Sequence, residues 1–78
     1  MSNRQKYNTV FTTLFGVNEK ELTALHYQGA DNWDSIGHMN MIAELEETFD
    51  IMMEIEDILD FSSYLKGFDI LKKYGIEL

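Results

Sequence analysis

The first fifteen residues carry the apolar spacing of an amphipathic helix. Five apolar side chains recur at i, i+3, i+4, i+7 and i+8, namely Tyr7, Val10, Phe11, Leu14 and Phe15. This spacing puts them on one face of a helix with 3.6 residues per turn. Ser2 and Gln5 have the spacing of a capping box, and Gly16 suits a C-terminal cap. A first helix that ends near residue 15 is therefore predicted.

Residues 35 to 49 predict a second helix with two apolar faces. The larger face is the natural core stripe, and its members are Met41, Ile42, Leu45 and Phe49. The opposite face has a shorter strip at i, i+3 and i+7, made of Ile36, Met39 and Ala43, with Asn40, Glu46 and Glu47 beside it. An outward apolar strip rimmed by carboxylates predicts a surface that binds another protein. The alternative is that a loop covers the strip.

The remaining segments predict shorter elements and connections. Residues 17 to 33 form a long connection, with a short helical turn near residues 19 to 25. Residues 51 to 55 are apolar enough for a strand, but no second strand-like run exists to pair with them, so we expect a packed connection. A short helix is predicted over residues 56 to 59.

A final helix is predicted from Ser62 or Ser63 to Gly75. The side chains expected on its core face are Tyr64, Leu65, Phe68 and Leu71, with Ile76 and Leu78 closing the end of the core. The predicted fold is thus all-α: one domain over residues 1–78, built as a small four-helix bundle of three main helices and one short helix.

Charge is distributed unevenly along the chain. The 78 residues have a net charge of −8, and no Lys or Arg lies between Lys20 and Lys66. Contacts with the phosphates of nucleic acids or anionic lipids need cationic side chains, so neither ligand is expected on this region. Basic protein partners are favoured instead. The simpler alternative is that the charge only confers solubility.

The composition also limits the location and chemistry of the protein. No apolar run is as long as a membrane span, and the first residues lack the apolar stretch of a secretory signal. We therefore expect a soluble, cytoplasmic monomer without membrane insertion. The chain has no cysteine, so thiol chemistry would require an attached group.

Asp34-Ser35-Ile36 places one hydroxyl at the start of the second helix. A phosphodiester on that hydroxyl would be stabilised by free backbone N–H groups and by the positive end of the helix dipole. Ser35 and His38 do not predict hydrolysis, because no oxyanion-hole pattern accompanies them. No metal site is expected either, since the spacing of the histidines and aspartates matches no zinc or calcium motif. We expect His38 to be a partly buried structural residue.

The chain resembles the acyl carrier proteins and related phosphopantetheine-bearing carrier domains. Asp34-Ser35-Ile36 is similar to the Asp-Ser-Leu motif of that family, and residues 41–49 resemble its second helix. The order of elements is also similar over nearly the whole chain. The resemblance implies the fold of an acyl carrier protein, with Ser35 as the attachment point and Asp34 as the support of the motif.

The resemblance further implies a carrier that is not an enzyme. A phosphopantetheinyl transferase would move 4'-phosphopantetheine from coenzyme A to Ser35, and the arm would carry acyl thioesters in fatty acid, polyketide or other specialised acyl-transfer pathways. The partners would be loading ligases or transferases and downstream synthase enzymes with basic docking surfaces. The residues implied to contact partners are Ile36, Met39, Ala43, Glu46, Glu47, Met53 and Glu54.

Two alternatives to an acyl carrier stay open. One is an aminoacyl, D-alanyl or peptidyl carrier with the same arm, and the other is an unmodified acidic helical adaptor. His38 and Asn40 stand where carriers of fatty acid synthesis usually have acidic residues. This departure favours the hypothesis of a specialised pathway carrier.

Overall fold

A computed structural model describes residues 1–78, and every regular element in it is helical. The elements in chain order are α1 (Asn3–Phe15), the 3₁₀ helix η1 (Glu19–Ala24), α2 (Ser35–Phe49), α3 (Ile55–Asp60) and α4 (Lys66–Lys72). The prediction of an all-α fold is confirmed. Only α1 and α2 are long, whereas α4 has seven residues and is shorter than the predicted final helix.

The caps of the long helices agree with the sequence pattern. The Gln5 amide donates to Ser2 Oγ at 3.1 Å, and the Ser2 amide donates to Gln5 Oε1 at 2.8 Å, which completes the capping box. Gly16 ends α1 in the left-handed region, at a φ of 64°. Asp50 ends α2 in the same conformation, which an aspartate tolerates better than most residues.

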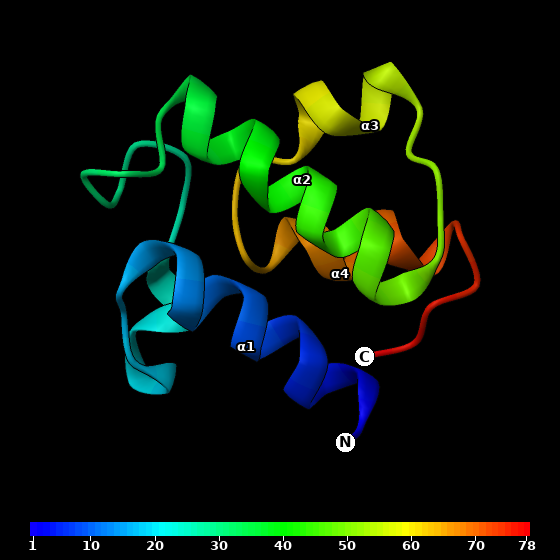
Figure 1. Cartoon of the computed structure of the whole chain (residues 1–78), viewed down its shortest axis with the longest axis horizontal. Coiled ribbons are helices and arrows are strands. Elements are labelled where there is room, and N and C mark those ends of the chain that lie inside the picture. Colours follow the sequence, from blue (N-terminus) through cyan, green and yellow to red (C-terminus); the bar gives the residue numbers. More distant parts are fainter.

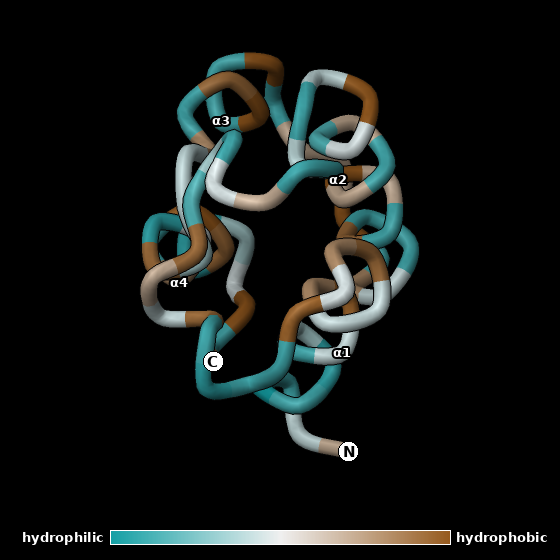
Figure 2. Tube along the Cα trace, turned by 90° about the vertical axis from the view of Figure 1, so that its left-hand side faces the viewer, coloured by the Kyte–Doolittle hydropathy of each residue, from teal (hydrophilic) through white to brown (hydrophobic).

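The helices form two layers around one core. Helices α1 and α2 lie side by side and run in opposite directions (Figure 1). Seen from the side, α3 and α4 stand opposite them (Figure 2). Fifteen buried apolar residues fill the space between the layers, and aromatic rings from α1, the loop before α2 and the segment after α3 contact one another there. The two termini meet, since Arg4 Nε donates to the Leu78 carbonyl at 3.1 Å.

The long connection before α2 is anchored to the segment that precedes α4. The Tyr27 amide donates to the Ser62 carbonyl at 2.8 Å, and the Tyr64 amide donates to the Leu25 carbonyl at 3.0 Å. Leu25 and Trp33 are buried beside these bonds. A connection of this length is therefore a fixed part of the fold, and it delivers residues 33–35 to a defined place.

The core face predicted for the last helix needs a correction. Leu65 is exposed, and Ile70 is buried in its place. The helix starts at Lys66, whose amide donates to Ser63 Oγ at 3.0 Å, so Leu65 lies in the turn before the helix and points outward. The segment between α2 and α3 is a packed connection, as predicted, with Met53 buried and Ile51 half-buried.

Candidate functional site

Ser35 is the first residue of α2, and its side chain is exposed. The Asp34 carboxylate accepts a hydrogen bond from the Gly37 amide at 2.9 Å and so caps the helix. The amides of Ser35 and Ile36 have no hydrogen-bond partner within the protein. An anion bonded to Ser35 Oγ would therefore meet two free N–H groups and the positive end of a 15-residue helix.

The turn that carries Ser35 is packed tightly against the preceding loop. A Cβ atom at position 37 would collide with the carbonyl oxygen of Asn32, so this position requires glycine. Asn32 itself is held by its side-chain amide, which donates to the Leu14 carbonyl at 2.6 Å. The start of α2 is thus fixed to the end of α1 through the loop.

An apolar groove of about 370 Å³ lies between the first turns of α2 and helix α3, with Ser35 on its lining. Its lining includes Ser35, Met39, Ile55, Ile58, Leu59 and Phe61. Phe61 is buried, whereas Ile55 and Leu59 are 64% and 77% exposed. The groove is therefore open to solvent on its α3 side and closed by the core beneath.

His38 joins both walls of this groove. The indole Nε1–H of Trp33 donates to His38 Nδ1 at 2.9 Å, and His38 Nε2 lies 2.7 Å from the Ile58 carbonyl oxygen. Because an indole N–H only donates, Nδ1 must be the unprotonated nitrogen and Nε2 must carry the proton. Both ring nitrogens are thus satisfied, and His38 is the half-buried structural residue that the sequence predicted.

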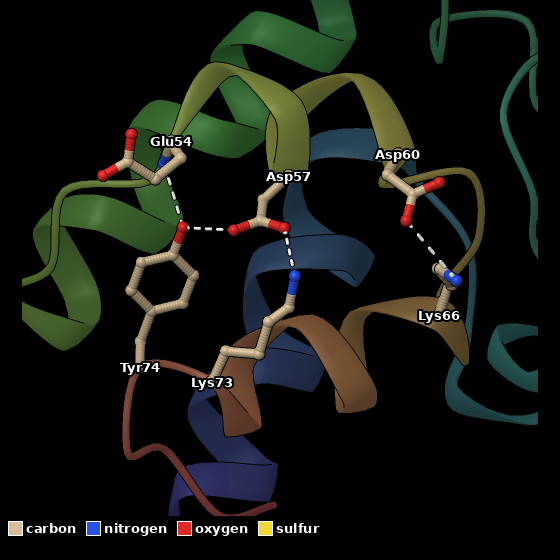
Figure 3. A network of polar contacts seen from close by, with 6 residues as sticks. All are labelled: Glu54, Asp57, Asp60, Lys66, Lys73 and Tyr74. Carbon is tan, nitrogen blue, oxygen red and sulfur yellow. Dashed lines mark hydrogen bonds and ion pairs between the residues drawn. The ribbon is translucent and has the colours of Figure 1, made fainter.

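Helix α3 is fastened on its other side by Asp57. Lys73 Nζ donates to Asp57 Oδ1 at 2.6 Å, and the Tyr74 hydroxyl donates to Asp57 Oδ2 at 2.5 Å (Figure 3). The same Tyr74 oxygen accepts a hydrogen bond from the Glu54 amide at 2.9 Å. The hydrogen bonds from Lys73 and Tyr74 lower the pKa of the Asp57 carboxyl, and the bond to Asp57 raises the pKa of Lys73.

The lowered pKa of Asp57 predicts an acid-sensitive contribution to stability. A carboxyl whose pKa is lower in the folded protein stabilises the fold above its unfolded pKa and loses that contribution as the pH falls below about 4. Urea unfolding between pH 7 and pH 2 should therefore show a smaller acid-dependent loss in Asp57→Asn than in the unchanged protein. Equal losses in the two proteins would contradict the role of this carboxylate.

Most of the outward strip of α2 is accessible. Ile36 and Met39 are 73% and 52% exposed, and Ala43 and Glu47 are exposed as well. No loop covers the strip, so that alternative is wrong.

The second predicted contact region needs a correction. Met53 is 8% exposed and belongs to the core, whereas Met52 is 88% exposed. Glu46 Oε2 accepts a hydrogen bond from the Met53 amide at 2.9 Å. This carboxylate therefore anchors the α2–α3 connection and also flanks the strip. Glu54 is exposed. Because its side chain is buried in the core, Met53 does not present it to a partner.

Sequence reasoning missed several residues that shape the site. Gly37 is an isolated glycine inside the helical pattern of residues 35–49, and its cost of about 1 kcal/mol relative to alanine is the one signal that could have drawn attention to it. Tyr27 and Phe61 line the groove from distant segments, and Asp57 was one acidic residue among many. No local signal marks these three residues, because their roles depend on which segments meet in the fold.

No protein-family model, curated protein or solved structure matches the chain. None of its helices combines the length and the apolar character needed to cross a membrane. No cluster of three or more His, Cys, Asp or Glu side chains is arranged to hold a metal ion.

Proposed function

We propose that this protein is an acyl carrier that holds its cargo as a thioester on a phosphopantetheine arm attached to Ser35. One observation carries the proposal: an exposed serine hydroxyl stands at the first turn of α2 and on the lining of an apolar groove. An arm attached there would have its phosphodiester at the helix N-terminus and would have an apolar surface within reach.

The residues around Ser35 fit such a group. The free amides of Ser35 and Ile36 suit a phosphodiester oxygen, and Asp34 caps the helix through Gly37 without blocking them. The arm would supply the thiol that forms the thioester, and the chain has no cysteine to compete with it. A groove of about 370 Å³ is at the small end of ligand pockets, which favours a short apolar group as its occupant.

The surface next to Ser35 suits protein partners with basic docking sites. Ile36 and Met39 offer exposed apolar area, and Glu47 adds negative charge beside Ala43. The partners would be a phosphopantetheinyl transferase, a loading ligase or transferase, and synthase enzymes that use the cargo. Because Ser35 and Ile36 are neighbours, modification and recognition would take place at the same helix end. The protein would then be a substrate of these enzymes and not a catalyst.

A second candidate is an unmodified acidic adaptor that binds partners through the same strip. The exposure of Ile36 and Met39 favours it, because that surface exists without any modification of Ser35. Aminoacyl, D-alanyl and peptidyl carriers belong with the first candidate, since they share the arm and differ in the enzyme that loads them.

Modification of Ser35 separates the two candidates. Purified protein is incubated with coenzyme A and a phosphopantetheinyl transferase of broad specificity, and its intact mass is measured. We expect the mass to rise by one phosphopantetheinyl group in the unchanged protein and not in Ser35→Ala. Ser62→Ala is the matched control, because Ser62 is another exposed serine on the lining of the groove. Loss of the mass gain in Ser62→Ala, or its persistence in Ser35→Ala, would argue against Ser35 as the attachment point.

A further inference from the structure

Helix α3 is attached to the protein with little apolar packing of its own. It has six residues, and its one buried side chain is the carboxylate of Asp57. Ile55 and Leu59 are mainly exposed, and Ile58 is half-buried. A segment with few buried apolar contacts opens at a lower free energy than the core around it. The position of α3 therefore depends strongly on polar bonds.

Apart from the exposed ion pair between Asp60 and Lys66 at 3.5 Å, two side-chain ties hold α3 (Figure 3). The outer tie joins Asp57 to Lys73 and Tyr74, at the end of α4 and just beyond it (Figure 3). The inner tie joins the Ile58 carbonyl to Nε2 of His38, on the first turns of α2. Both residues of the inner tie, His38 and Ile58, contribute to the lining of the groove.

The inner tie continues to the loop that places Ser35. Trp33 donates to His38 Nδ1, and Trp33 lies two residues before Ser35. The Trp33 carbonyl accepts the Gln28 amide at 2.9 Å, and the Trp33 amide donates to the Ala30 carbonyl at 3.0 Å. Trp33 therefore links the His38 ring, through its indole, to a loop backbone that is itself hydrogen-bonded at this residue.

We propose that the Trp33–His38–Ile58 chain of hydrogen bonds couples helix α3 to the turn that carries Ser35. The two bonds of His38 share one rigid ring, so a displacement of Ile58 that keeps its bond to Nε2 rotates the ring and changes the geometry of the bond from Trp33. An occupant of the groove that pushes α3 outward would therefore change the attachment turn. This functional meaning rests on the proposed carrier function, whereas the coupling itself belongs to the unmodified protein.

The coupling is tested by weakening the outer tie and measuring amide hydrogen exchange in the turn that carries Ser35. Asp57→Asn removes the charge that binds Lys73, and site-resolved amide hydrogen exchange is measured on the full chain without cofactor. We expect exchange at the Asp57 and Ile58 amides, which donate to the Glu54 carbonyl, to rise about tenfold. We also expect a rise of about threefold at the amides of Gln28 and Gly37.

The same measurement in a His38→Phe background shows whether the coupling between α3 and the turn passes through His38. Phenylalanine retains a ring at this position but has neither hydrogen bond, so Asp57→Asn should still raise exchange in α3 and should no longer raise it at Gln28 and Gly37. Equal rises at the turn in both backgrounds would overturn the proposal. So would an absence of any rise at the turn when Asp57→Asn is introduced alone.

A matched control and a milder variant support this test. Tyr64→Phe removes a different side-chain hydrogen bond, the one from the Tyr64 hydroxyl to Asn8 Oδ1, and it should leave the transmission from α3 to the turn unchanged. If Asp57→Asn fails to fold, Tyr74→Phe releases the bond from Tyr74 to Asp57, together with the bond from the Glu54 amide to the same hydroxyl, and keeps the bond from Lys73. None of these variants alters Ser35, so a negative result in the exchange experiment leaves the test of Ser35 modification valid. Likewise, a failure to modify Ser35 leaves the exchange experiment valid, because that experiment uses the unmodified protein.

Discussion

Replacement of Trp33 by alanine should lower the free energy of unfolding by about 3 to 5 kcal/mol. Trp33 is fully buried, and its ring stacks on Phe15 with a centroid distance of 4.9 Å and meets Phe11 edge-on at 5.6 Å. Its indole also donates to His38. Alanine would leave a large cavity where α1, α2 and the long loop meet. A domain of this size has a total stability of roughly 5 to 15 kcal/mol, so the loss would be severe.

Urea unfolding followed by far-ultraviolet circular dichroism measures this effect, because it does not depend on tryptophan fluorescence. Met39→Ala is the matched control, since Met39 is a large apolar residue that is half exposed on α2. It should cost little stability. If Met39→Ala destabilised the protein as much as Trp33→Ala, the assignment of inward and outward faces would be wrong.

Gly37→Ala is expected to destabilise the protein by about 1 to 3 kcal/mol, although alanine is the better helix former. At an unhindered position inside a helix the same change is favourable by about 1 kcal/mol. Here the added Cβ would collide with the Asn32 carbonyl oxygen, which is part of a loop that Leu14 and Trp33 hold in place. The first turn of α2 would have to shift, and transfer of phosphopantetheine to Ser35 should become slower.

The sign of the stability change makes this prediction sharp. Thermal or urea unfolding of Gly37→Ala is compared with that of Asn40→Ala, a control at an exposed position of the same helix. We expect the control to be neutral or slightly stabilising. A gain in stability for Gly37→Ala would show that the loop yields easily and that the attachment turn is not tightly packed.

The long helices were predictable because their signals are local. The apolar spacing of residues 7–15 and the capping box at Ser2 specify α1 without reference to the rest of the chain. Asp34 at the N-cap and the stripe that includes Met41 and Leu45 specify α2 in the same way. Each of these signals lies within a few residues of the structure that it determines.

Tertiary contacts decide the features that the sequence pattern misplaced. Met52 and Met53 are chemically identical neighbours, and only the packing of the connection against the core distinguishes the exposed Met52 from the buried Met53. Asp57 is one of many acidic residues, and its special role comes from Lys73 and Tyr74, which lie sixteen and seventeen positions further along the chain. No local pattern contains this information.

Some features of the candidate site depend on local sequence signals, and others depend on tertiary contacts. The exposed hydroxyl of Ser35 and the outward strip follow from the helical pattern, because both depend on one helix. The groove depends on α3 lying opposite the start of α2, and the hydrogen bonds of His38 depend on both Trp33 and Ile58. The pattern could predict that His38 is partly buried, but it could not name the partners of its two nitrogens.

The carrier function is decided by the intact mass of the protein after incubation with coenzyme A and a phosphopantetheinyl transferase. We expect a gain of one phosphopantetheinyl group, located by peptide mass mapping on the fragment that contains Ser35. A mass that stays unchanged under conditions in which a known carrier protein is fully modified would contradict it.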